Sequence, residues 1–144
     1  DRLTFACAEE ALIMIEDVSL VNGVKSAISE LYPSARLKKI DVYGVSDDEL
    51  LLINNKHLQH DYFTDIITFD YSKGNRISGE LYVSVDRVKD NATALGLTYE
   101  SELTRVVAHG ILHLIGFKDK TKEEAAVMRS KEDEVLAYLD KYGS

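Results

Sequence analysis

The chain has 144 residues, 45% of them hydrophobic and 29% charged, and a formal net charge of −8. These fractions exclude a disordered chain, and the length lets one domain, residues 1–144, bury a core without disulfide bonds. The longest apolar run, Ala11–Ile15, is too short to span a membrane, and no signal-peptide pattern is present. With a single cysteine, these features predict a cytoplasmic protein. The acidity argues against sequence-blind nucleic-acid binding but leaves room for a local basic patch.

Apolar periodicity and turn signals predict alternating strands and helices along the chain. In chain order we expect a strand at Leu3–Ala8, a helix at Val18–Leu31, a strand at Arg36–Val45, a helix from Ser46 to about His57, strands at Asp65–Tyr71 and Glu80–Val85, and helices at Ser84–Leu95, Thr98–Leu114 and Thr121 to about Tyr142. This order predicts an α+β fold, with helices packed on a mixed four-stranded sheet.

Local signals set several of these boundaries. Ser46 and Thr121 each stand three residues before a glutamate, which is the pattern of a capping box at a helix start. Gly96 is expected to end one helix, and Thr98 is a suitable N-cap for the next. In the last helix the residues expected to face inward are Ala125, Met128, Val135, Leu136 and Leu139.

Residues 109–119 carry the strongest chemical signal. His109 and His113 are four residues apart in an apolar segment predicted to be helical, so both imidazoles share one face. Gly116 can end this helix, after which the chain can bring Asp119 back as a third ligand. The spacing is similar to that of metzincin-like zinc sites and predicts a metal bound by three residues, with a water in the fourth position.

The residue after the first histidine separates this site from a peptidase. Zinc peptidases place a glutamate general base there, whereas this chain has Gly110. A peptidase or another zinc hydrolase therefore needs a base from elsewhere and ranks third among the hypotheses for function.

Two imidazoles and one carboxylate favour zinc, although this donor set also suits nickel, iron, cobalt or manganese. The carboxylate cancels one charge of a divalent ion, so we expect a weaker Lewis acid than at a site with three histidines. Lys118 and Lys120 flank Asp119 and are candidate contacts for a phosphodiester. No side chain is identified as the general base, and either a metal-activated water or the 2′-hydroxyl of RNA can be the nucleophile.

Other polar residues give weaker signals. His57 and His60 are three apart at a helix end and are interpreted as exposed rather than as ligands. Asp65 and Thr68 are interpreted as turn or strand-edge groups, and Glu80 as the outward side of its strand.

Three motifs together resemble the YbeY family of bacterial endoribonucleases and rRNA maturation factors. The family motif His-Gly-x-Leu-His-Leu-x-Gly-Tyr-Asp-His is matched from His109 to Gly116, with Phe117 in place of the tyrosine. A second motif, Asn-x3-Arg-x2-Asp-x2-Thr-Asp/Asn-x-Leu-Ser-Phe, is matched at Asn54, Asp61, Thr64, Asp65, Thr68 and Phe69, with Ile67 for leucine. A third, Gly-Asp-Ile-x-Ile-Ser, corresponds to Gly79, Glu80, Leu81, Val83 and Ser84.

The chain departs from the family pattern in two places. Asp119 stands where the family has its third histidine ligand, with Lys118 in the place of the usual aspartate. Leu58 replaces the arginine of the second motif, which in the family is thought to assist catalysis or RNA contact. Both departures bear on the metal and on the nuclease rate more than on the fold.

The resemblance implies a metal-dependent endoribonuclease specific for single-stranded RNA, acting in small-subunit rRNA maturation and in ribosome quality control. Its implied partners are rRNA and the ribosome. The alternative is a non-catalytic or weakly active assembly factor that binds ribosomal proteins, which the acidic surface and the loss of the arginine favour.

Overall fold

The computed structural model describes residues 13–14, 18–58 and 64–142 of the chain. Within them the elements are β1 (Ile13–Met14), α1 (Val18–Leu31), β2 (Arg36–Val45), α2 (Asp47–Leu58), β3 (Ile66–Asp70), β4 (Arg76–Ser84), α3 (Val85–Leu95), α4 (Tyr99–Leu114) and α5 (Lys122–Tyr142). None of the described helices is long and apolar enough to cross a membrane.

The sheet is mixed, with strand order β1-β2-β4-β3. Its central strands β2 and β4 run parallel, with Val42 opposite Leu81, and α2 and β3 lie between them in the chain. The outer strands β1 and β3 pair antiparallel with β2 and β4 respectively. The fold predicted from the sequence, an α+β domain with a mixed four-stranded sheet, is confirmed.

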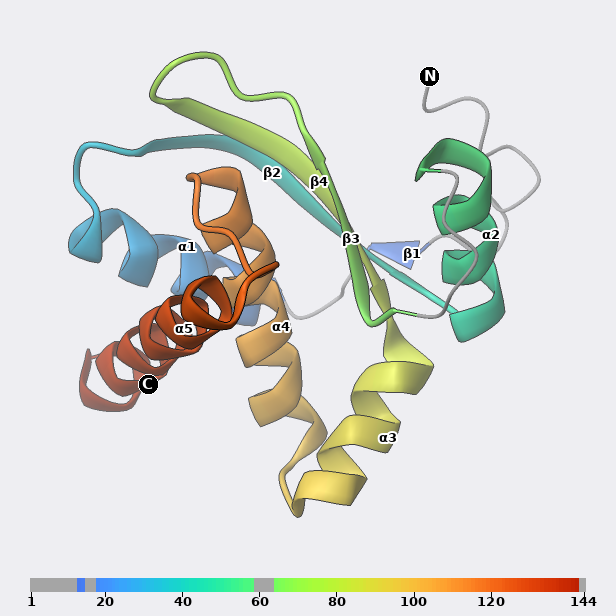
Figure 1. The fold of residues 1–144 in the computed structure, drawn as a ribbon. Coiled ribbons are helices and arrows are strands. Elements are labelled where there is room, and N and C mark those ends of the chain that lie inside the picture. Colours follow the sequence, from blue (N-terminus) through green and yellow to red (C-terminus); the bar gives the residue numbers. More distant parts are fainter. Residues whose placement is uncertain (1–12, 15–17, 59–63, 143–144) are drawn as a thin grey trace.

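Helices cover both faces of the sheet (Figure 1). Because side chains alternate along a strand, Leu81 and Val83 point to the face covered by α1 and α4, whereas Tyr82 points to the face covered by α2. Helix α5 packs against α1 and α4 rather than on the sheet itself (Figure 1). Helix α4 therefore lies between the sheet and α5. Residues on the side of α4 that points away from the sheet face α5 and the loop before α5.

Most predicted boundaries are confirmed. Helix α1 and strand β2 have the predicted bounds, Ser84 and Thr98 are the N-caps of α3 and α4, and Gly96, with φ 69°, ends α3. Both capping boxes form: in each, the hydroxyl accepts from the glutamate N–H and the glutamate carboxylate accepts from the backbone N–H of the capping residue. The predicted strand at residues 3–8 lies outside the described residues.

Three expectations were wrong. Glu80 does not face outward: only 2% of it is exposed, and its carboxylate accepts hydrogen bonds from the hydroxyls of Tyr71 and Tyr82, which provide a polar environment under α2. Ala125 is exposed rather than inward-facing. Strand β4 begins at Arg76, earlier than predicted, because Arg76 and Ile77 already pair with β2 and Gly79 pairs with both β2 and β3.

Candidate metal centre

The end of α4 turns the chain back over the helix. The N–H of Phe117 donates to the carbonyl of Leu112 (3.1 Å) and that of Gly116 to the carbonyl of His113 (3.1 Å), which together form a Schellman motif. Gly116 has φ 116°, a conformation that side-chain-bearing residues rarely adopt. The predicted role of this glycine is confirmed, and the turn places Asp119 above the helix.

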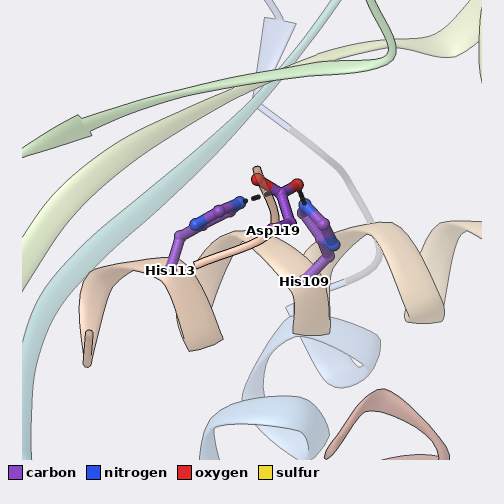
Figure 2. Close-up of side chains that lie close together, drawn as sticks. All are labelled: His109, His113 and Asp119. Carbon is purple, nitrogen blue, oxygen red and sulfur yellow. Dashed lines mark ion pairs between the residues drawn. The ribbon is translucent and has the colours of Figure 1, made fainter. Parts of the chain in front are cut away.

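The three predicted ligands meet at one point. His109 and His113 rise from the same side of α4, and Asp119 reaches back over them from the following loop (Figure 2). The Nε2 atoms of the two histidines lie 3.1 and 3.3 Å from the same atom, Oδ2 of Asp119. One potential ligand atom from each residue lies within 4.8 Å of the others, which is consistent with a single metal ion.

The other ring nitrogen of each histidine has an acceptor. Nδ1 of His109 lies 2.6 Å from Oε2 of Glu132 on α5, and Nδ1 of His113 lies 2.9 Å from the carbonyl oxygen of Phe117. A carbonyl only accepts, so Nδ1 of His113 carries the proton. Both rings thus have Nδ1 as donor, which leaves the Nε2 lone pairs of the neutral rings for a metal.

Glu132 connects the site to a wider ionic network. It is 5% exposed, and its second oxygen accepts from Arg105 at 3.0 Å, while Arg105 also donates to Asp133 at 2.8 Å. Burial acts to raise the pKa of Glu132, but the contacts with His109 and Arg105 outweigh it and lower that pKa. Burial likewise acts to lower the pKa of His109, yet Glu132 and Asp119 raise it overall. Glu132 is therefore an anion that holds the His109 ring.

A pocket of about 450 Å³ opens beside the three candidate ligands. Its polar lining includes Asp65 just before β3, Glu102 and Arg105 from α4, and Arg129 from α5. Burial is the main cause that raises the pKa values of Asp65 and Glu102. Oε1 of Glu102 has no hydrogen-bond partner among the described residues. The pocket therefore combines a metal-ligand cluster with two carboxyl groups whose pKa values burial raises.

Sequence reasoning did not assign Glu102, Arg105 or Glu132 to this pocket, although two kinds of signal could have identified them. Glu102, Arg105, His109 and His113 recur at helical spacing along one face of α4, so the polar character of that face extends two turns before the histidines. Glu132 stands between Met128 and Val135 in the buried stripe of α5. A charge inside an apolar stripe indicates a buried partner.

The other polar residues considered in the sequence differ in their relation to this pocket, and some of them lack a described side chain. Lys118 and Lys120 are exposed and their side chains do not line the pocket. Asp65 and Thr68 do line it, which gives them a place at the site that the sequence reading did not assign. His57 falls in the last turn of α2 without a described side chain, and His60 lies outside the described residues.

Gly110 faces the sheet instead of the pocket. A Cβ atom added there would lie 2.8 Å from Cδ1 of Ile66 and 3.0 Å from the δ-carbons of Leu81. A glutamate at this position would thus enter apolar packing between α4 and the strands. The helix face next to the first histidine is used for close packing, and not for a general base.

Fold and site together define an α+β domain with a candidate metal centre of two histidines and one carboxylate. The model of the family "Endoribonuclease YbeY" matches residues 7–140. The chain therefore belongs to the YbeY endoribonuclease family, and it is an endoribonuclease by this membership.

Individual relatives agree with this assignment. A Flavobacterium johnsoniae protein named endoribonuclease YbeY is 56% identical over 96 residues, which cover 66% of this chain and 69% of the relative. A Parabacteroides distasonis protein of the same name is 44% identical over 119 residues, 83% of each chain. A Thermotoga maritima protein of known solution structure is similar in fold, with a TM-score of 0.58 and 30% identity over 88% of each chain.

Proposed function

We propose that this endoribonuclease depends on one divalent metal ion held by His109, His113 and Asp119, with zinc the default ion. It cleaves single-stranded RNA and acts in the cytoplasm, in small-subunit rRNA maturation and ribosome quality control, with the ribosome as partner. The chemistry that such an ion supplies is polarisation of a phosphoryl oxygen and activation of water.

The observation that carries this proposal is the orientation of both imidazoles. Each Nδ1 is held by an acceptor, and each Nε2 is directed at the same carboxylate oxygen, 3.1 and 3.3 Å away. Two neutral nitrogens and one carboxylate oxygen form a donor set that fits zinc, and also nickel, iron, cobalt or manganese. Histidine ligands in metal sites are typically oriented by this kind of carboxylate or carbonyl acceptor.

The residues around the ligands have separate tasks. Glu132 fixes the ring of His109, and the Phe117 carbonyl fixes that of His113. Arg105 balances the buried charge of Glu132. The buried side chains of Val106 and Met128 form apolar parts of the pocket wall. These residues orient the site before RNA arrives.

The first test is metal content per chain, measured by elemental mass spectrometry on untagged protein beside an Asp119→Ala variant. We expect near-stoichiometric metal that falls in the variant. Cleavage of a single-stranded RNA, compared with its duplex, should then require metal and be lost in His113→Ala. Metal absent after incubation with zinc, nickel, iron and manganese would contradict the proposal.

The alternative is an assembly factor with little or no catalysis. The net charge of −8 favours it, because an acidic surface can dock basic ribosomal proteins, and so does Leu58 in place of the family arginine. Binding to ribosomal particles that is equal in wild type and His113→Ala, without metal-dependent RNA cleavage by either, would favour this alternative.

A further inference from the structure

The pocket contains two arginines with different surroundings. Arg105 is engaged on both sides, by Glu132 at 3.0 Å and by Asp133 at 2.8 Å. Arg129 is exposed and makes no ion pair with any residue that the structure describes. Among the described cations lining the pocket, Arg129 is thus the one whose guanidinium is available to an incoming anion.

The placement of Arg129 follows from helix geometry. The residues of α5 that line the pocket are Ala125, Met128, Arg129 and Glu132. They recur at intervals of three and four, so they form one face of the helix. Arg129 therefore stands one turn from Glu132, the residue that holds His109. The positive charge of Arg129 also acts on Glu102 of α4: burial raises the pKa of Glu102, and Arg129 acts to lower it.

The negative charges of the pocket mean that RNA binding there needs a cation to offset them. Its lining includes four carboxylates, those of Asp65, Glu102, Asp119 and Glu132, and a phosphodiester brought next to them is repelled. In the family pattern an arginine stands at position 58, at the end of α2, but this chain has Leu58 there. The lysines beside Asp119 do not line the pocket.

We propose that Arg129 binds a phosphate of the RNA backbone beside the metal centre. In this chain it takes the role of the family arginine that Leu58 replaces. Its planar guanidinium can donate two parallel hydrogen bonds to one phosphate, which positions the strand as well as neutralising it. Arg129 is in this sense a substrate-positioning residue, and the inference rests on the proposed cleavage of single-stranded RNA at this pocket.

The test compares wild type with Arg129→Gln and Arg129→Lys. Arg36→Gln is the matched control, because it removes the same charge from an exposed arginine at the start of β2, outside the pocket. Equilibrium binding of a fluorescent single-stranded RNA is measured by anisotropy in excess chelator, where no turnover occurs, over a series of salt concentrations. Cleavage kinetics with metal are measured in parallel, and circular dichroism verifies that each variant is folded.

We expect Arg129→Gln to weaken RNA binding about tenfold, the effect of one lost charge-assisted contact. The slope of log affinity against log salt should fall by about 0.7, the value for one phosphate contact on a single strand. Arg129→Lys should retain most of that slope but lose affinity, since an ammonium group cannot donate in the bidentate geometry. Arg36→Gln should match wild type.

Equal effects of Arg129→Gln and Arg36→Gln would overturn the proposal, because they would show a general charge effect. Unchanged binding and kinetics in Arg129→Gln would also overturn it. If wild-type protein neither binds nor cleaves RNA, it is the proposed function that fails. This outcome is distinguishable from a failure of the Arg129 proposal, in which wild type is active and the variants behave alike.

Discussion

Glu132 is the residue that orients His109, one of the three candidate ligands. Its carboxylate is shared between His109 and Arg105, with Nδ1 of His109 only 2.6 Å away. Sequence reasoning found the two histidines and the aspartate because their spacing is local to one helix and its C-terminal turn. Glu132 was missed because it approaches from another helix, 23 residues further on.

Replacing Glu132 by glutamine should lower the affinity for metal by about 10–100-fold, as is typical when the acceptor behind a ligating histidine is lost. The amide keeps the shape but not the charge that orients His109. Asp133→Asn is the control, because Asp133 binds Arg105 without touching His109. Competition with a chromophoric chelator measures both variants, and equal losses in the two would contradict this role of Glu132.

Glu102 should make stability depend on pH. It is 6% exposed, and burial raises its pKa in the folded protein. The folded state therefore binds the proton more tightly than the unfolded state does. The stabilisation from this protonation is fully present below the pKa of Glu102 in the unfolded chain and is lost as pH rises through its pKa in the folded protein. We expect Glu102→Gln to match wild type near pH 4 and to be the more stable protein at pH 8. Urea unfolding at both pH values measures this, and a difference independent of pH would refute it.

At the scale of elements, the boundaries that the sequence predicted well are those set by local chemistry. Capping boxes at Ser46 and Thr121 and the glycine turn at Gly96 are decided within a few residues, so short-range patterns are sufficient. Burial of Glu80 is decided by tyrosine hydroxyls on β4 and in the segment after β3. Alternation along one strand cannot reveal such partners.

Gly79 is where the metal-bearing helix meets the sheet. A Cβ atom there would lie 2.5 Å from the backbone oxygen of Phe69 and 2.9 Å from Cδ2 of Leu114. Gly79→Ala should therefore lower the free energy of unfolding by about 1–3 kcal/mol, through overpacking against a backbone that cannot move aside easily.

Gly23→Ala is the control for this substitution. Gly23 lies in α1, where an added Cβ would make an ordinary contact of 3.6 Å with Leu139. Because alanine is the better helix former, this variant should gain about 1 kcal/mol. Chemical denaturation of both variants tests the pair, and a stabilised Gly79→Ala protein would show that α4 is not packed so closely on β4.

For the molecule as a whole, the acidic net charge and the available arginine of the pocket, Arg129, imply different determinants for docking and for cleavage. A net charge of −8 repels RNA at long range, so affinity for a strand must come from contacts within the pocket. Composition predicted this overall constraint. It could not place Arg129 next to the histidines, because that requires the packing of α5 against α4.

The metal should also stabilise the whole fold, because its ligands and their acceptors lie on α4, the following loop and α5. An ion that binds the folded state alone, at a concentration 100 times its dissociation constant, adds about 2.7 kcal/mol to the free energy of unfolding. For a chain of this length we expect a rise in Tm of roughly 8 °C. Asp119→Ala should lose most of this rise while melting like wild type in chelator, since its carboxylate is 38% exposed and partly solvated. Thermal unfolding with zinc, nickel or manganese ranks the ions, and an equal rise in Asp119→Ala would place the binding site elsewhere on the protein.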